Sequence, residues 1–235
     1  MISVCLASYN GAAYIRQQLE SIIPQLSEGD EIIISDDGST DGTLDVVAAM
    51  ESPLIKVVVN QGDHGYTPNF ENALRHASGD YIFLSDQDDV WRADKVDVCL
   101  RHLRDVDMVI ADASLIDGEG KEIGGSYHAI RGSRPGLLAN LVRFSYLGCF
   151  MAFRRRVLDR ALPFPANHRY CTHDNWLGIV AMTFYTARVI DDKLIGYRRH
   201  GANTSAGGLK KTTSAWFKIA YRLYLLRHLA ARIRT

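Results

Sequence analysis

The chain has 235 residues, of which 47% are hydrophobic and 23% charged, proportions typical of a globular domain with one sizeable core. This composition excludes long disordered segments, and no run of about 18 apolar residues predicts a membrane span. The 27 basic and 27 acidic residues balance overall, but the acids all lie before residue 193.

The first half of the chain alternates short apolar runs with helical patterns. Met1 leads directly into the first run without a basic leader, so we predict no signal peptide. Strands are predicted over residues 2–7, 30–35, 55–59 and 81–85. Helices are predicted over residues 15–26, 43–50 and 67–77. This alternation predicts right-handed βαβ units, and therefore an α/β fold with a Rossmann-like, mostly parallel central sheet flanked by helices.

The second half is less regular. Strands are predicted over residues 108–111, 150–154, 187–190 and 194–198, and helices are expected to begin near residues 94, 135 and 174. A segment rich in Gly, Ser, Thr and Lys covers residues 201–213, and a last amphipathic helix follows. The four cysteines form no CxxC pair, so we expect reduced thiols in a cytoplasmic protein.

Three polar clusters directly follow predicted strands. They are Ser8-Tyr9-Asn10, Asp36-Asp37 and the acidic run that begins at Asp86. Ligands of parallel α/β sheets gather beyond the carboxyl ends of the strands. The three clusters therefore predict one site at one edge of the sheet.

The sharpest local signal is the acidic sequence Ser85-Asp86-Gln87-Asp88-Asp89-Val90-Trp91. Three carboxylates within four residues repel one another unless a cation lies among them. Mg²⁺ and Mn²⁺ prefer oxygen ligands and share them with substrate phosphates. An isolated acidic turn is more often solvated or a helix cap, but its position after a buried strand favours a metal site.

These motifs resemble the family-2 glycosyltransferases of GT-A fold. The resemblance rests on Ser8-Tyr9-Asn10, Ser35 to Asp41, Asn60-x-Gly62, Gly79 to Asp89, His173-Asp174 and Tyr197 to Asn203. It covers the chain from Met1 to about Asn203 and is closest to bacterial enzymes that build polysaccharides, including rhamnosyltransferases. It implies an inverting transfer of sugar from a UDP- or dTDP-linked donor to a saccharide acceptor, free or lipid-linked.

The resemblance also implies roles for individual residues. Ala7, Tyr9 and Asp37 would contact the nucleotide base, and Asp86 the ribose. Asp88 and His200 would bind the metal, and Asp174 would act as the general base. Asp174 lies at a predicted helix start, where an Asp on position alone is more often a cap. The roles of Asp86, Asp88 and Asp89 exchange between relatives.

The acceptor region is defined less sharply. Trp91, Trp176, Gly148 and Cys149 are its candidates, although each tryptophan alone predicts core or cleft wall. The catalytic domain is expected to span residues 1–213, with a nucleotide-sugar half over 1–111 and an acceptor half over 112–213. Arg198 and Arg199 either hold phosphate charge or flank a solvent-exposed strand. We also expect residues 201–213 to order over bound donor.

Other classes of protein fit less well. A nucleotidyltransferase would show a Gly-rich basic loop after the first strand, and a dehydrogenase would show GxGxxG there. A catalytically degenerate nucleotide-binding or scaffold protein would not need Asp37, Asp86, Asp88, Asp174 and His200 together. Nucleic acid is not an expected partner, because residues 1–192 carry 17 basic and 27 acidic side chains and would repel it.

Residues 214–235 predict a basic amphipathic helix. Residues 193–235 contain ten Lys and Arg and no acid. One helical stripe is apolar, and it consists of Trp216, Ile219, Leu223, Leu226, Ala230 and Ile233. Such a helix either lies peripherally on the inner face of the cell membrane or docks on the catalytic domain. The sequence leaves both alternatives open.

Overall fold

The first strands and helices follow the predicted order. The computed structural model describes residues 1–201 and 214–233. Its strands are β1 (Ile2–Ser8), β2 (Glu31–Asp36), β3 (Ile55–Val59), β4 (Tyr81–Asp86), β5 (Val90–Trp91), β6 (Met108–Ile116), β7 (Glu122–Ser126), β8 (Met151–Arg154) and β9 (Ala187–Arg198). Its helices are α1 (Ile15–Ile22), α2 (Thr43–Ala48), α3 (Tyr66–His76), α4 (Lys95–Leu103), α5 (Tyr127–Arg131), α6 (Leu137–Val142), α7 (Arg155–Ala161), α8 (His173–Phe184) and α9 (Ala215–Arg232). Two 3₁₀ turns, η1 (Ile23–Gln25) and η2 (Gly148–Phe150), complete the described elements.

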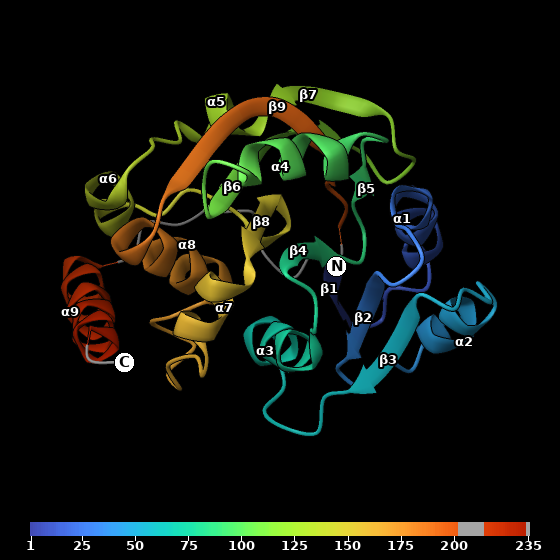
Figure 1. The fold of residues 1–235 in the computed structure, drawn as a ribbon, viewed down its shortest axis with the longest axis horizontal. Coiled ribbons are helices and arrows are strands. Elements are labelled where there is room, and N and C mark those ends of the chain that lie inside the picture. The colour runs from blue at the N-terminus through green and yellow to red at the C-terminus, as the bar shows by residue number, and fades with distance from the viewer. Residues whose placement is uncertain (202–213, 234–235) are drawn as a thin grey trace.

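The described strands form one curled sheet in the order β3-β2-β1-β4-β8-β6-β9-β5, with β7 paired to β6 (Figure 1). The four strands β3, β2, β1 and β4 are all parallel. Every residue of β2 is buried, and in β1 all but Ala7 are buried. Burial on both faces explains why both strands have nearly continuous apolar sequences. The predicted parallel sheet is confirmed in this half.

The other half of the sheet is mixed rather than parallel. β8 pairs antiparallel with both β4 and β6, and β5 pairs antiparallel with β9. The predicted strands 187–190 and 194–198 are one strand, β9, parallel to β6. The register shifts after Ile110, so the exposed Asp191-Asp192 pair bulges from the ladder without ending the strand.

β7 has no counterpart among the predicted strands. Its sequence contains Gly124 and Gly125, which lower β-propensity and hide the alternation of a strand. Pairing with β6 holds it in place.

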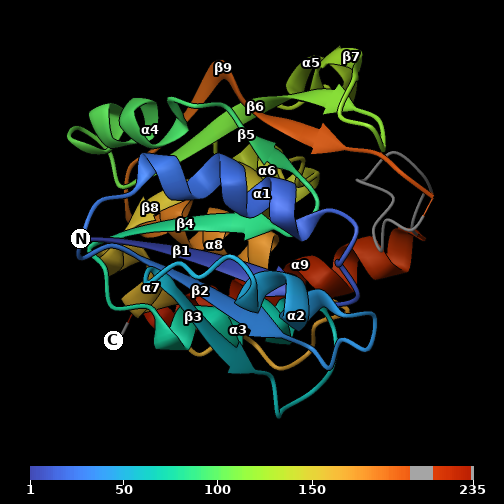
Figure 2. The same cartoon turned by 90° about the vertical axis from the view of Figure 1, so that its right-hand side faces the viewer.

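Helices cover both faces of the sheet. α3 packs against β1 and β2 and contacts α8, whereas α1 packs against α2 and β5. Right-handed crossovers place α1 and α3 on opposite faces, as Figure 2 shows. α1 turns Ile15, Leu19 and Ile22 into the core, the face predicted from its helical period.

The C-terminal helix α9 lies beside α8 at one end of the domain (Figure 1), and it leaves an apolar face exposed. Leu225 and Leu229 are buried against the core, with Tyr221 and Tyr224 packed beside them. The predicted apolar stripe faces away, since Trp216 is 77% exposed and Leu223 63%. The docked face of α9 is therefore a second row of apolar side chains, which includes Leu225 and Leu229. The predicted apolar stripe stays exposed to solvent.

No helix within the described residues is long and apolar enough to cross a membrane. The expected ordering of residues 201–213 over bound donor concerns a segment that, beyond Gly201, lies outside the described residues. The division of the chain at residue 213 stays a prediction for the same reason.

Candidate active site

A cleft of about 980 Å³ opens at the carboxyl ends of β1, β2 and β4. Both halves of the chain line it. From the predicted site residues the cleft brings together Ala7, Tyr9, Asp37, Asp86, Asp88, Gly148 and Asp174. The three polar clusters that follow strands in the sequence thus meet at one edge of the sheet, as predicted.

The turn after β1 is fastened to the acidic loop by one glutamine. The backbone N–H of Tyr9 donates to Gln87 Oε1 at 2.8 Å, and Gln87 Nε2 donates to the carbonyl of Tyr9 at 2.9 Å. Gly11 lies directly beneath this amide, because a Cβ there would lie 2.2 Å from Gln87 Oε1 and would displace it. The Tyr9 side chain remains 55% exposed at the cleft edge, free to pack on a ligand.

The turn after β2 presents Asp37 in a fixed orientation. Asn60 Nδ2 donates to Asp37 Oδ1 at 2.7 Å, and the backbone N–H of Gly65 donates to Asp37 Oδ2 at 2.8 Å. Asp36 faces away and accepts hydrogen bonds from Ser8 and from its own loop. Only the second carboxylate of the pair therefore lines the cleft.

The acidic loop after β4 carries three carboxylates with different surroundings. Asp86 and Asp88 line the cleft, whereas Asp89 is buried. Burial and the neighbouring Asp88 carboxylate raise the pKa of Asp86 to about 7, and similar causes raise the pKa of Asp89. His200 Nε2 lies 2.9 Å from Asp88 Oδ2, so the structure brings together the two residues predicted to bind metal.

A buried cluster supports this loop from below. Ligand atoms of Asp86, Asp89 and Cys149 lie within 4.8 Å of one another. Burial raises the pKa of the Cys149 thiol well above its usual value, so the sulfur stays protonated and is a poor ligand for a hard cation. The carboxylate of Asp88, which lines the cleft, and the imidazole of His200 beside it fit Mg²⁺ or Mn²⁺ better.

A buried lysine compensates part of this negative charge. Lys95 Nζ donates to the carbonyl of Cys149 at 2.9 Å and lies 3.9 Å from the centre of the Trp91 ring. Its burial lowers its pKa to about 8. No role for Lys95 is predicted from the sequence, because Trp91 lies on β5 and Lys95 begins α4, so only the fold brings the two side chains together.

Arg198 fastens the acidic loop from the side. It is 1% exposed, and its guanidinium donates to the carbonyls of Asp88, Asp117 and Gly118 and to Gln17 Oε1. Both alternatives expected for Arg198, phosphate binding and a solvent-exposed strand flank, are therefore wrong. Its planar fork holds the Asp88 backbone against two other parts of the chain.

Asp174 lies in the first turn of α8, facing the same cleft. The N-cap is Thr172, and the Thr172 hydroxyl donates to Asp174 Oδ1. Asp174 is therefore not the helix cap, which was the alternative that its position alone favoured.

The acceptor candidates separate into cleft and core. Gly148 lines the cleft, whereas Cys149 lies fully buried behind it. Trp176 is fully buried and donates through Nε1 to the carbonyl of Ala161, and Trp91 is buried under Lys95. The two tryptophans thus belong to the core and do not line the cleft.

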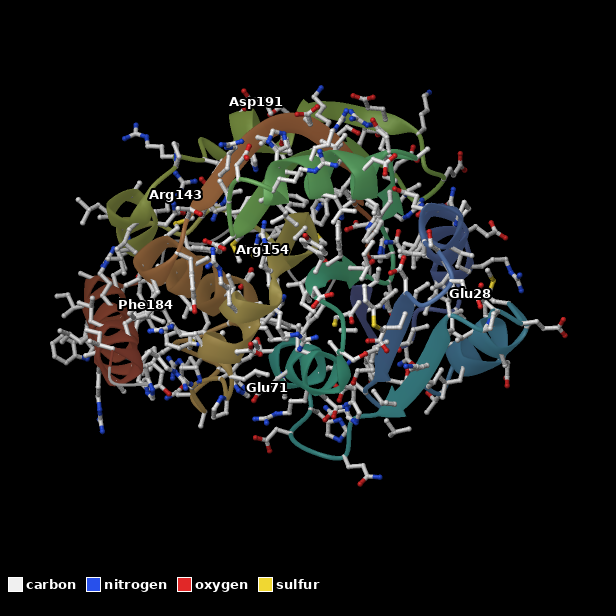
Figure 3. The ribbon with its side chains drawn as sticks, viewed as in Figure 1. Glu28, Glu71, Arg143, Arg154, Phe184 and Asp191 are labelled. Carbon is white, nitrogen blue, oxygen red and sulfur yellow. The ribbon has the colours of Figure 1, made fainter. Side chains whose placement is uncertain are left out.

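A second depression, of about 470 Å³, lies near the start of β4 and the end of β8. Its basic lining does not make it an anion site. Arg154, labelled in Figure 3, donates to the carbonyls of Leu103 and Val106, and Arg156 pairs with Asp107. These guanidinium groups hold the chain together.

Solved structures with the same fold bind nucleotide sugars. The complex of S. aureus TarS 1-349 with UDP-GlcNAc superposes with a TM-score of 0.72 at 20% identity, covering 99% of this chain and 66% of that one. The mannosyltransferase PcManGT from Pyrobaculum calidifontis, in complex with GDP-Man and Mn²⁺, gives 0.63 at 20% identity, covering 99% and 74%. The fold is accordingly the GT-A fold.

Similar sequences show the family. The chain is 27% identical to the putative teichuronic acid biosynthesis glycosyltransferase TuaG of Bacillus subtilis, over 92% of this chain and 86% of that one. It is 28% identical to the dTDP-rhamnosyl transferase RfbG of Shigella flexneri, over 95% and 79%. The model of glycosyl transferase family 2 matches residues 3–162, well over half of the chain. The protein is a glycosyltransferase and belongs to glycosyl transferase family 2.

Proposed function

We propose that this enzyme transfers a sugar, with inversion, from a UDP- or dTDP-linked donor to a saccharide acceptor, free or lipid-linked, in the synthesis of a bacterial cell-surface polysaccharide. The observation that carries this proposal is the meeting of Asp37, Asp88 and Asp174 in one cleft. Each has a different partner set and a different position around the cleft. That arrangement suits base recognition, phosphate neutralisation and proton removal at three separate points.

The nucleotide would occupy the donor half of the cleft. Tyr9 presents an exposed ring for the base, and Ala7 presents backbone beside it. Asp37, held by Asn60 and Gly65, accepts the imide N–H of a uracil or thymine. Asp86 follows on β4 and would accept a ribose hydroxyl. A carboxylate at the imide position favours uracil and thymine over bases without that donor.

Asp88 and His200 would hold a divalent cation beside the diphosphate, as their 2.9 Å contact allows. When bound, Mg²⁺ or Mn²⁺ neutralises charge on the leaving diphosphate. Arg198 keeps the Asp88 backbone in place. Asp174, across the cleft, takes the proton of the attacking hydroxyl as the new bond forms, so one displacement inverts the anomeric centre.

The donor class and the biological setting rest on similarity. RfbG is named for dTDP-rhamnose, and WfgD of Escherichia coli, 23% identical over 92% of this chain, for UDP-glucose. TuaG is named for teichuronic acid biosynthesis, and WfgD for an acceptor linked to diphosphoundecaprenol. The four cysteines, all free and buried, support a cytoplasmic site of action.

The proposal is tested by release of nucleoside diphosphate. The purified protein is incubated with UDP-glucose, UDP-N-acetylglucosamine or dTDP-rhamnose, a bacterial lipid extract as acceptor, and Mg²⁺ or Mn²⁺. We expect release that requires both metal and acceptor. Tight nucleotide binding without any release would favour the scaffold alternative. In a parallel incubation with UTP or dTTP and a sugar 1-phosphate, release of inorganic pyrophosphate would favour a nucleotidyltransferase.

The pH dependence of metal binding follows from the acidic loop. The pKa of Asp86 in the folded protein is about 7, above its ordinary value of 3.8. Because this pKa is raised, the protonated form of Asp86 stabilises the folded protein. Without metal, this contribution to the free energy of unfolding is lost as pH rises through 7. A cation favours the ionised form, so we expect Mg²⁺ plus UDP to raise Tm more at pH 8 than at pH 6. Differential scanning fluorimetry measures this, and Asp86→Asn should remove the difference; an equal rise at both pH values would contradict it.

We also propose that α9 holds the enzyme on an anionic membrane surface. The exposed stripe includes Trp216, Ile219 and Leu223, 77%, 49% and 63% exposed. Arg222 donates to the carbonyls of Leu141 and Val142, so the stripe lies beside the end of α6. Further exposed apolar side chains on that helix are Leu138 and Val142.

Charge favours a lipid surface as the occupant. Residues 214–233 carry four basic side chains, Lys218, Arg222, Arg227 and Arg232, and no acid, which suits anionic headgroups. Tyr221 contacts Asn175, a residue that lines the cleft. The helix therefore places the acceptor side of the cleft near the lipid surface, where a lipid-linked acceptor would be anchored.

Replacing Trp216 and Leu223 by Glu should reduce co-sedimentation with vesicles containing phosphatidylglycerol by about tenfold or more. The change removes inserted apolar surface and adds repulsive charge. The matched control places two Glu residues at exposed apolar positions outside the stripe, Val57→Glu on β3 and Ile123→Glu on β7. Equal binding of both double variants, or binding of the parent protein to neutral vesicles alone, would contradict lipid docking.

A further inference from the structure

A second exposed tyrosine lines the cleft besides Tyr9. Tyr66 is the first residue of α3 and is 46% exposed. The other Phe and Tyr rings that line the cleft within the described residues are buried or half-buried, and they are Phe70, Tyr127, Phe144, Tyr146 and Tyr197. An apolar surface exposed at the wall of a binding cleft gains free energy when a ligand covers it. Tyr66 therefore offers a ring that a ligand in the cleft can reach.

The position of Tyr66 is fixed from both sides. The backbone N–H of Gly65 donates to Asp37 Oδ2 at 2.8 Å. The backbone N–H of His173 donates to Thr67 Oγ1 at 3.3 Å, so the first turns of α3 and α8 are joined. The ring of Tyr66 meets the ring of His173 edge-on, with ring centres 5.8 Å apart and planes at 72°. A ring held in this way loses little conformational entropy when a ligand packs on it.

Tyr66 lies beside the proposed general base. Asp174 follows His173 in the first turn of α8, and both Tyr66 and Asp174 line the cleft. Burial raises the pKa of the Tyr66 hydroxyl, and the negative charge of the nearby Asp174 raises it further. A general base contacts the attacking hydroxyl, and the anomeric carbon of the donor lies beyond that hydroxyl. The sugar ring nearest to Asp174 and Tyr66 is therefore that of the acceptor.

We propose that the ring of Tyr66 is the stacking platform for the acceptor sugar, the sugar that carries the attacking hydroxyl. This inference rests on the proposed function. A pyranose has an apolar face of C–H groups with hydroxyls around its edge, and such a face packs on an aromatic ring in a cleft. Packing on Tyr66 orients the acceptor so that one hydroxyl reaches Asp174. Trp91 and Trp176 lie in the core, so neither of them can provide this surface.

The test separates acceptor binding from donor binding in Tyr66→Ala. Release of nucleoside diphosphate is measured with the nucleotide sugar that the parent protein uses, at graded amounts of bacterial lipid extract. We expect the amount of extract that gives half-maximal release to rise about tenfold, because truncation of a tyrosine that anchors a ligand commonly costs that much affinity. Calorimetric Kd values for the nucleotide sugar and for its diphosphate, with Mg²⁺ present, should stay within about twofold.

Three further variants define the role of the ring. Tyr66→Phe keeps the ring without its hydroxyl and should need an amount of extract close to that of the parent. Tyr9→Ala should weaken nucleotide binding and leave the half-maximal amount of extract unchanged at saturating donor. Ile123→Ala truncates an exposed side chain on β7 outside the cleft and should change none of these quantities. Thermal unfolding of Tyr66→Ala should stay close to that of the parent, because Tyr66 is an exposed residue.

The outcomes are distinct. An unchanged half-maximal amount of extract in Tyr66→Ala overturns the inference and leaves the proposed function standing. An equal loss of affinity for the nucleotide sugar would place Tyr66 against the donor and also overturns it. A loss in Tyr66→Phe as large as that in Tyr66→Ala assigns the effect to the hydroxyl and overturns the stacking role. Absence of acceptor-dependent release by the parent protein would overturn the proposed function itself, and the inference with it.

Discussion

Replacing Asp174 by Asn is expected to lower kcat by about 10²- to 10⁴-fold, because the attacking hydroxyl loses the carboxylate that accepts its proton. Asn keeps the size of the side chain and can still accept from the Thr172 hydroxyl, so α8 should remain intact. The affinity for donor nucleotide should change less than twofold. Steady-state release of nucleoside diphosphate, with calorimetric Kd values beside it, measures both quantities.

A matched control is available on a surface helix. Asp97→Asn, in the exposed first turn of α4, makes the same chemical change at a helix start outside the cleft and should leave kcat unchanged. If Asp174→Asn keeps more than a tenth of the parent kcat, Asp174 is not the general base. A parallel loss of donor affinity would instead indicate a binding role for Asp174.

Replacing Asp88 by Asn is expected to abolish the metal dependence of diphosphate binding. Loss of a partner outside the coordination shell weakens metal binding about 10- to 100-fold, so loss of a ligand should reach at least the upper end of that range. Titration of UDP with and without Mn²⁺ measures the effect. Uridine, which has no phosphate, should bind the variant and the parent equally.

His200 provides the second half of this prediction. His200→Ala should weaken metal-dependent binding in the same direction, since its Nε2 lies 2.9 Å from Asp88 Oδ2. Asp105→Asn, an exposed carboxylate far from the cleft in the turn after α4, is the control. Undiminished Mn²⁺ dependence in both Asp88→Asn and His200→Ala would place the cation elsewhere, with the buried Asp86, Asp89 and Cys149 cluster as the alternative.

The sequence predicted the parallel half of the fold well because β1, β2 and β4 are buried on both faces. Runs such as Ile32-Ile33-Ile34 are unambiguous when each is followed by polar turn residues. Tyr9, Asp37 and Asp88 could be placed in one site because strand ends in a parallel sheet meet at one edge. Local patterns determine these features.

The mixed half depends on long-range pairing that periodicity does not record. β7 forms on β6 despite two glycines, and β9 continues through an acidic bulge because β6 extends beside it. The buried charges were missed for the same reason. Arg198 and Lys95 have the appearance of surface residues in the sequence, and only tertiary contacts give them partners.

The stripe on α9 shows a different limit. Trp216, Leu223 and Ile233 were correctly grouped on one face, but periodicity alone does not say whether a face is buried or exposed. The helix carries two apolar lines, and the domain covers the one that includes Leu225 and Leu229. Only the docked structure shows which line remains for another partner.

The most direct test of the account is ligand-dependent thermal stability of the parent protein. A panel of UDP, dTDP and GDP compounds, with and without Mn²⁺ or Mg²⁺, is measured by differential scanning fluorimetry. A ligand at about 100 times its Kd adds about 2.7 kcal/mol to the free energy of unfolding, or about 5 to 10 °C for a chain of this size. We predict a metal-dependent rise of that order with UDP or dTDP compounds. A folded protein whose Tm no nucleotide changes would contradict the claim that this cleft binds a nucleotide-sugar donor.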